Sequence, residues 1–210
     1  AASDVYKRQV DGYTTLESLP YSQRASLSDA TQDTLNPDGT TQRLVNDKVG
    51  YIRNSVKATV DAYDGTVDLY EFDKNDPVLK AWEGVFPDVV KPEAEISDEL
   101  REHFRYPEDM FKVQRDLLAR YHVDDPNVFF NNDAFWSVPN DPTAEESRQL
   151  NQPPYYVMAA DPETGKPTFQ LTTSYRGLNR EFLSAHMAVS SDPENYGDIT
   201  VRVLPTNTPV

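Results

Sequence analysis

The chain has 210 residues, which is enough for one substantial hydrophobic core or two small ones. Its net charge of −15 disfavours binding to nucleic acid or to an anionic membrane surface, because both need basic side chains. The absence of cysteine excludes disulfides and thiolate chemistry, and an aromatic content of 11% argues against a disordered chain.

The N-terminal part divides into two segments by composition. The first nine residues, AASDVYKRQ, are similar to translated adapter sequence, and we expect 1–9 to be a non-native tail. Residues 10–47 are rich in Thr, Ser, Asp and Gln and include the turn signal Asn36-Pro37-Asp38-Gly39, which predicts an extended or loop-rich segment. Residues 48–210 are expected to form a single, incomplete α+β domain, without an apolar stretch long enough to span a bilayer.

The clearest strand signal in that domain runs from Val56 to Phe72, where apolar and polar residues alternate around Asp64-Gly65. Asp-Gly suits a type I′ turn, because both positions accept positive φ and the turn matches the twist of paired strands. The segment therefore predicts an antiparallel hairpin.

A two-residue turn would fix the pairing of this hairpin. It would place Val60 opposite Leu69, and Asp61 opposite Asp68 on the other face. Like charges directly opposite each other are destabilising, so we expect solvent or a nearby cation to offset the repulsion of the two aspartates.

Three helices are expected after the hairpin. Asp76 and Ser97 are the predicted N-caps of two short helices, and Pro107 begins a longer one. In the longer helix, Lys112 and Arg115 are expected to face solvent, opposite one buried apolar face. That predicted buried face consists of Met110, Val113, Leu117, Leu118 and Tyr121.

Two further hairpins are predicted near the C-terminus, each with a glycine in its connection. One joins 155–160 to 168–173, and the other joins 182–189 to 199–204, although 182–189 is also compatible with a helix. Hairpins combined with helices predict an α+β fold: antiparallel hairpins packed with amphipathic helices and long ordered loops.

Motifs for catalysis are lacking. His103, His122 and His186 have no metal-ligand spacing, and there is no nucleotide-binding loop or nucleophile elbow. His122 instead suits a partner of the C-terminal dipole of the longer helix. The sequence predicts no catalytic residue, no metal and no cofactor, and it favours a non-enzymatic role, while a carboxylate pair of the glycosidase kind stays open.

The best candidate for a ligand site is DDPNVFFNNDAFW, from Asp124 to Trp136. Aromatic rings can stack on sugars while amides and carboxylates bind the hydroxyl groups. The alternative, which we favour, is that the aromatics anchor a long loop to the core and that the Asn and Asp side chains satisfy turns. The candidate ligand-binding residues are Phe130, Asn131, Asn132, Asp133, Phe135 and Trp136.

Two long stretches resemble the uncharacterised protein family UPF0182, namely YIRNSVKATVDAYDGTVDLYEFD and RYPEDMFKVQRDLLARYHVDDPNVFFNNDAFWSVPNDP. The segments GYTTLESLPYSQ and PPYYVM with FQLTT also fit, whereas RGLNREFLSAHMAV departs from the family pattern. The resemblance covers most of residues 10–205. It implies a large bacterial integral membrane protein with N-terminal transmembrane helices and a large extracytoplasmic region, of which this chain is a fragment. It implies no activity and no catalytic residues.

We therefore expect a non-enzymatic interaction or assembly domain of a cell-membrane protein, attached through a transmembrane region absent from this chain. Its partner would be an unknown envelope protein or a glycan. The alternative is a glycan-binding or carboxylate-dependent glycan-active domain that uses the loop 124–136. Burial of all four aromatics of this loop, Phe129, Phe130, Phe135 and Trp136, would exclude the sugar platform.

Overall fold

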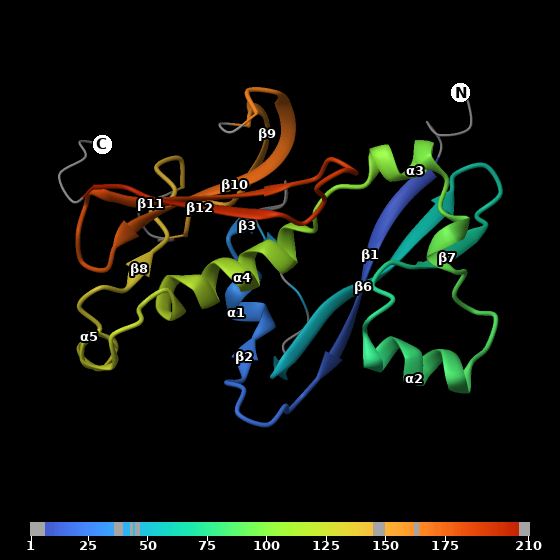
Figure 1. Cartoon of the computed structure of the whole chain (residues 1–210), viewed down its shortest axis with the longest axis horizontal. Coiled ribbons are helices and arrows are strands. Elements are labelled where there is room, and N and C mark those ends of the chain that lie inside the picture. Colours follow the sequence, from blue (N-terminus) through green and yellow to red (C-terminus); the bar gives the residue numbers. More distant parts are fainter. Residues whose placement is uncertain are drawn as a thin grey trace. The chain divides into compact units, whose positions relative to one another are not determined.

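The computed structural model describes residues 7–35, 40–42, 44, 47–144, 150–161 and 164–205 (Figure 1). It confirms the α+β class, with antiparallel sheets and a few helices. Contacts group the chain into a first unit, Ala1–Ser26 with Asp47–Pro107, and a second unit, Leu27–Asn46 with Glu108–Val210. The division at residue 48 that the sequence suggested stays a prediction.

The first unit is built on a three-stranded antiparallel sheet in the order β1-β6-β7. The sheet includes Lys7, opposite Asp61, so part of the segment set aside as a tail is described as strand. The elements of the unit are β1 (Lys7–Leu16), β2 (Ala25–Ser26), β5 (Lys48–Val49), β6 (Tyr51–Asp61), β7 (Val67–Glu71), α2 (Pro77–Val85), the 3-10 turn η2 (Glu93–Glu95) and α3 (Asp98–His103).

The β6–β7 hairpin is confirmed, but its predicted register is wrong. Val60 lies opposite Val67, because residues 62–66 form a wider connection than a two-residue turn. Two carboxylates hold this connection through short-range bonds: Asp61 accepts from the N–H two residues on at 2.8 Å, and Asp64 does the same at 2.9 Å. Such bonds compete with a tighter turn, and Gly65 provides the positive φ of 76°.

The shifted register also removes the expected pair of like charges. Asp68 lies opposite Thr59, and its carboxylate pairs with the Lys91 amine at 2.7 Å. The two aspartates therefore do not face each other, and the cation that offsets Asp68 comes from outside the hairpin.

A buried lysine lies on the more enclosed face of β6. Lys57 is only 2% exposed. Its amine pairs with the Asp11 carboxylate at 2.5 Å and lies 5.0 Å and 5.6 Å from the ring centroids of Phe72 and Phe104. A carboxylate and two aromatic rings thus compensate the burial of this charge.

Both short helices of the first unit begin as predicted. Asp76 is the N-cap of α2, and its carboxylate accepts from the Val78 N–H at 2.9 Å. Ser97 caps α3 by accepting from the Leu100 N–H at 3.2 Å. Both caps satisfy an N–H of the first turn, which otherwise lacks a partner.

The second unit is built on a sheet in the order β12-β11-β10-β8, with β9 also paired to β10. Both predicted C-terminal hairpins are confirmed, with positive φ at Gly165 and Gly197, and 182–189 lies largely in a strand rather than a helix. The elements are α1 (Leu27–Thr31), β3 (Thr34–Leu35), β4 (Thr41–Gln42), α4 (Glu108–Tyr121), α5 (Pro126–Asn131), β8 (Trp136–Ser137), β9 (Tyr155–Ala160), β10 (Pro167–Gly177), β11 (Leu183–Ser190) and β12 (Ile199–Val203).

The helix α4 covers the middle of one face of this sheet. It contacts β8, β10 and α1, and the Tyr175 hydroxyl of β10 donates to the Arg115 carbonyl of α4 at 2.9 Å. Beneath it, Leu171, Met187 and Val189 are at most 1% exposed. This contact forms the core of the second unit.

The predicted buried face of α4 is only partly right. Met110 and Val113 are buried, but Leu117 is 42% and Tyr121 is 51% exposed. Leu117 and Tyr121 therefore lie at the surface and Leu118 is half-buried, while the buried side of the helix includes residues outside the predicted stripe.

Two of those other residues are charged. Lys112 and Arg115, which we expected to face solvent, are each 1% exposed. The two oxygens of the buried Asp33 carboxylate take one cation each, Lys112 and Arg115, both at 2.7 Å. The Glu108 carboxylate adds a second partner for Lys112 at 2.8 Å. Both buried cations are thus compensated, which makes this side of the helix suitable for the interior.

Candidate functional site

The predicted site segment 124–136 folds into the helix α5 followed by a turn. The Asp125 carboxylate caps α5 by accepting from the Asn127 N–H at 2.8 Å. The helix ends at Asn131, and the C-cap residue Asn132 has a left-handed φ of 57°. Asn tolerates this conformation better than most residues. Asp125 therefore caps the start of the helix, and Asn132 terminates it.

Part of the aromatic cluster points inward. Phe135 is 9% exposed, and its ring centroid lies 5.1 Å from that of Phe129 in an edge-to-face contact. Trp136 stacks on His122 with centroids 3.5 Å apart and lies 5.2 Å from the ring of Tyr175. These rings attach the segment to the second unit, as expected for a loop anchor.

His122 fixes the same connection from the end of α4. Its Nδ1 lies 2.8 Å from the Leu118 carbonyl oxygen, in the last turn of the helix, and its Nε2 lies 3.0 Å from the Ala134 carbonyl oxygen. The imidazole therefore links the C-terminus of α4 to the turn before β8, and its position agrees with the predicted dipole partner.

One aromatic of the segment is different. Phe130 is 88% exposed, and Asn131, Asn132 and Asp133 beside it are exposed as well. Because the four aromatics are not all in the core, the sugar platform is not excluded. The structure separates Phe130 from Phe135 and Trp136, so a ligand of this surface would meet one ring rather than the predicted cluster.

A second candidate surface, which the sequence analysis missed, lies on the outer strands of the five-stranded sheet. Cross-strand partners share a face of a sheet. Tyr156 pairs with Leu171, Leu171 with Val189, and Val189 with Ile199. One face therefore runs from β9 across the covered middle strands to β12.

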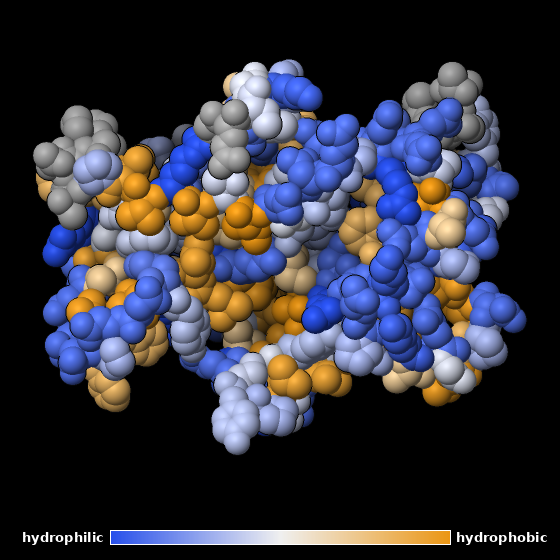
Figure 2. Space-filling model, viewed as in Figure 1, coloured by the Kyte–Doolittle hydropathy of each residue, from blue (hydrophilic) through white to orange (hydrophobic). Residues whose placement is uncertain are grey.

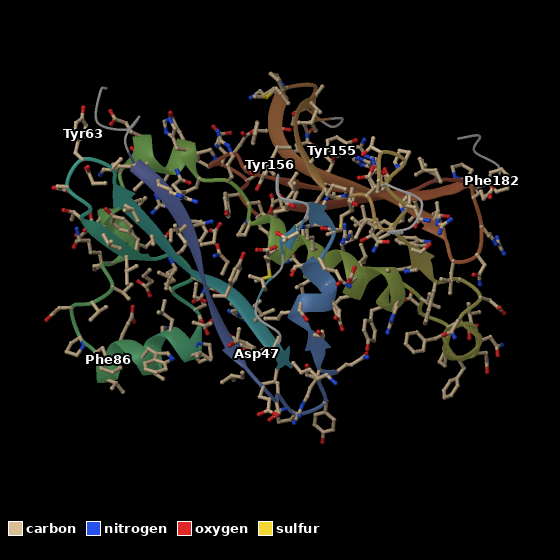
Figure 3. All side chains as sticks on the ribbon, turned by 180° about the vertical axis from the view of Figure 1, so that it is seen from behind. Asp47, Tyr63, Phe86, Tyr155, Tyr156 and Phe182 are labelled. Atoms are coloured by element: carbon tan, nitrogen blue, oxygen red, sulfur yellow. The ribbon has the colours of Figure 1, made fainter. Side chains whose placement is uncertain are left out.

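On this face of the sheet, the side chains of the two outer strands are exposed, whereas those of the middle strands are buried. On β9, Tyr156 is 39% and Met158 is 63% exposed, and we name these two residues the β9 flank. On β12, Ile199, Val201 and Val203 are 40%, 36% and 69% exposed, and we name them the β12 flank. Figure 2 shows hydrophobic side chains along β12 above α4, and Figure 3 labels Tyr155 and Tyr156 on β9.

The sequence carried a signal for these strands but not for their exposure. Both YYVMAA and ITVRV are apolar enough to be interior strands. Whether a strand lies at the centre or the edge of a sheet depends on the order of pairing, which alternation along one strand does not encode.

A fully buried carboxylate of the first unit has a structural role. Asp76 is 0% exposed, and its Oδ2 accepts from the Thr14 and Ser55 hydroxyls, each at 2.5 Å. Its Oδ1 accepts from the Tyr51 hydroxyl at 2.7 Å and from the N–H of Val78. One side chain thus joins β1, β6 and α2, and no substrate can reach it in this conformation.

These contacts alter the acidity of the two titratable groups. Burial alone would raise the pKa of Asp76, but the hydrogen bonds from Ser55, Thr14, Tyr51 and Val78 outweigh it and lower the pKa to about 2. Burial, together with the hydrogen bond to Asp76, raises the pKa of Tyr51 to about 12. Asp76 is therefore an anion at neutral pH.

Neither a metal centre nor a membrane-spanning helix is found in the part of the chain that the structure describes. Among the described residues, no three side chains of His, Cys, Asp or Glu come together in a group that could hold a metal ion. Within the same ranges, each helix is too short or too polar to cross a bilayer.

Comparison with protein families identifies a match over nearly the whole chain. The model described as "Uncharacterised protein family (UPF0182)" matches residues 6–210. The chain is 75% identical over 199 residues to a UPF0182 protein of Corynebacterium glutamicum, with 94% of this chain and 20% of that protein covered. It is 72% identical over 198 residues to one of Corynebacterium efficiens and 64% identical over 200 residues to one of Rhodococcus jostii, with 94% and 95% of this chain and 20% of each relative covered. The chain thus spans about a fifth of the length of these relatives, and no solved structure matches it.

Proposed function

Because the chain belongs to the uncharacterised protein family UPF0182, we propose that it is a non-enzymatic interaction or assembly domain of a longer bacterial membrane protein. The observation that carries this proposal is the bare apolar surface of the β9 flank. Tyrosine and methionine are enriched at protein interfaces and are costly to leave in water, so an exposed pair on an ordered strand favours a docking role.

The geometry of β9 also suits contact with a protein. Tyr155 lies opposite Thr172, so its side chain occupies the face of the sheet opposite to that of Tyr156. Tyr155 is 52% exposed, and the Tyr156 ring stacks on Phe169 with centroids 5.6 Å apart. A partner protein bound at the end of β9 can contact rigid aromatic side chains on both faces of the sheet, at a small cost in side-chain entropy.

A location outside the cytoplasm, at the cell membrane, is part of the same proposal. It is supported by the resemblance to membrane proteins of this family. The matched relatives are long enough to hold a membrane region besides a domain of this size.

A photo-activatable cross-linking residue at Met158 tests the interaction in cells that produce the full-length protein. We expect one discrete adduct after illumination, whose partner mass spectrometry identifies. The matched control is the same residue at Lys166, which is exposed in the connection between β9 and β10. Equal or absent cross-linking at the two positions would refute an interface on the β9 flank.

Glycan binding is the second candidate function, and the exposure of Phe130 favours it. The ring can stack on a sugar while Asn131 or Asp133 binds hydroxyl groups. Titration of the chain with envelope glycan fragments, followed by calorimetry, should then show binding that Phe130→Ala abolishes. Binding that survives Phe130→Ala, or that is absent from the parent chain, would refute this candidate.

A further inference from the structure

The outer strand β12 has the composition of an interior strand. Ile199, Val201 and Val203 alternate along it on the face shared with the buried Met187 and Val189, yet they are 36% to 69% exposed. Edge strands of stable proteins usually carry protection such as inward-pointing charges, prolines or bulges. The only charged residue of β12, Arg202, lies on the opposite face.

The backbone of the same strand is open to pairing. The Leu204 N–H donates to the Ser184 carbonyl, and the Ser190 N–H donates to the Asp198 carbonyl. Because hydrogen-bonded pairs alternate along an antiparallel ladder, residues 200 and 202 also bond towards β11. The N–H and C=O groups of residues 199, 201 and 203 therefore point to the outer edge, where no strand within the described ranges pairs.

We propose that β12 is completed by a further strand from another part of the same full-length polypeptide, so that the sheet continues beyond the 210 residues of this chain. The proposal rests on the assembly role proposed above and names the partner of one of its surfaces. The added strand would lie about 4.8 Å from β12, and its own apolar side chains would cover Val201 and Val203.

Three observations favour the same polypeptide over other occupants. The chain covers about 20% of its relatives, so most of the polypeptide lies outside it. The β12 flank is aliphatic and β-branched, as in the interior of a sheet, and lacks the aromatic residues and methionine typical of interfaces between proteins. A second copy is disfavoured because each chain carries a net charge of −15.

Cross-linking in the full-length protein tests the assignment without a destabilising substitution. With a photo-activatable residue at Val203, we expect peptide mapping to join position 203 to a segment of the same polypeptide outside these 210 residues. The yield should not depend on protein concentration, since the reaction is intramolecular. The control is the same residue at Lys166, which is exposed in the connection between β9 and β10 on the far side of the sheet from β12, and where we expect at least a fivefold lower yield to that segment.

The outcomes distinguish this proposal from the proposed function. An adduct of position 203 with a second copy or with another protein would overturn the intramolecular strand and leave the interaction role intact. Intramolecular cross-linking at 203 with no adduct at Met158 would support the strand and count against the partner on β9. Equal yields at 203 and 166, or no product at 203, would overturn the strand.

Hydrogen exchange provides a second measurement. The amides of Ile199, Val201 and Val203 point to the open edge and should exchange at least tenfold more slowly in the full-length protein than in the 210-residue chain. The amides of Thr200 and Arg202, which bond towards β11, should change much less. Equal exchange of the first set in both proteins would refute the added strand.

Discussion

Replacement of Asp76 by alanine should destabilise the protein by about 3–5 kcal/mol. The change removes a buried carboxylate that accepts four hydrogen bonds from two strands and from its own helix. Each buried donor left without an acceptor costs about 1–3 kcal/mol, and the loss of an N-cap costs about 1 kcal/mol. The Thr14 and Ser55 hydroxyls lie 3.1 Å apart and can bond each other, so we take the lower part of the summed range.

The effect should also depend on pH. The folded state lowers the pKa of Asp76 to about 2, from an ordinary value of about 3.9, which corresponds to ~2–3 kcal/mol of stability. Because the folded pKa is the depressed one, this contribution is fully present above about pH 4 and is lost as the pH falls through 2. Asp76→Asn keeps a capping residue but no charge, and it should therefore lose less stability than the parent between pH 5 and pH 2.

Urea denaturation followed by circular dichroism measures both effects. The matched control is Asp73→Ala, which removes a partly exposed pair with Arg53 and should cost about 1 kcal/mol or less. Equal free energies of unfolding for Asp76→Ala and Asp73→Ala, or equal acid sensitivity of Asp76→Asn and the parent, would refute the role assigned to Asp76.

Three other substitutions test the second unit. Asp33→Ala leaves Lys112 and Arg115 buried without their shared carboxylate and should lower the free energy of unfolding by about 3–5 kcal/mol in chemical denaturation. The control is Glu194→Ala on the surface, and an equal loss in both variants would contradict the compensating role of Asp33. Met110→Ala should lower stability by about 2–5 kcal/mol, whereas Leu117→Ala, at an exposed position, should lower it by less than about 1 kcal/mol. A lower melting temperature for Leu117→Ala than for Met110→Ala would show that the buried face of α4 is wrongly assigned. Phe135→Ala should lower stability by about 3–5 kcal/mol and Phe130→Ala by less than about 0.5 kcal/mol. Equal melting temperatures for the two variants would contradict the assignment of Phe135 as buried and Phe130 as exposed.

Local patterns predicted the elements of this fold well. The helix caps at Asp76 and Ser97 and the hairpins around Gly165 and Gly197 depend on a few neighbouring residues, and the structure contains all of them. Alternation and capping act over one or two turns of chain, so a single sequence encodes them directly. The register of β6 and β7 was missed because the carboxylates of Asp61, at the end of β6, and Asp64, in the connection, stabilise a wider connection.

Burial was predicted less well than the elements, for a reason that three cations share. Lys57, Lys112 and Arg115 all lie in the interior, because a carboxylate distant in sequence meets each of them. The partner residues, Asp11 and Asp33, lie in a segment expected to be extended or loop-rich. Long-range compensation of this kind leaves no periodic trace, so charge alone assigned Lys112 and Arg115 to the surface.

The candidate site shows the same limit. Composition identified 124–136 as an aromatic and polar segment, but it could not separate the exposed Phe130 from the inward Phe135 and Trp136. The flanks of β9 and β12 were missed altogether, because strand order decides their exposure. Ligand binding at the segment remains a prediction.

The pairing of Asp33 with α4 has a consequence for the order in which the protein is made. Asp33 leaves the ribosome 82 residues before Arg115, which is roughly 4–16 s earlier at ordinary rates of synthesis of about 5–20 residues per second. During most of that interval the residues of the first unit from Asp47 to Pro107 are being made, and the helix α1 has been made before its partner α4. A gene fragment that begins at Glu108 would encode the two cations without their anion. Expression of the complete second unit as one natural segment therefore requires the intervening residues Asp47–Pro107 as well.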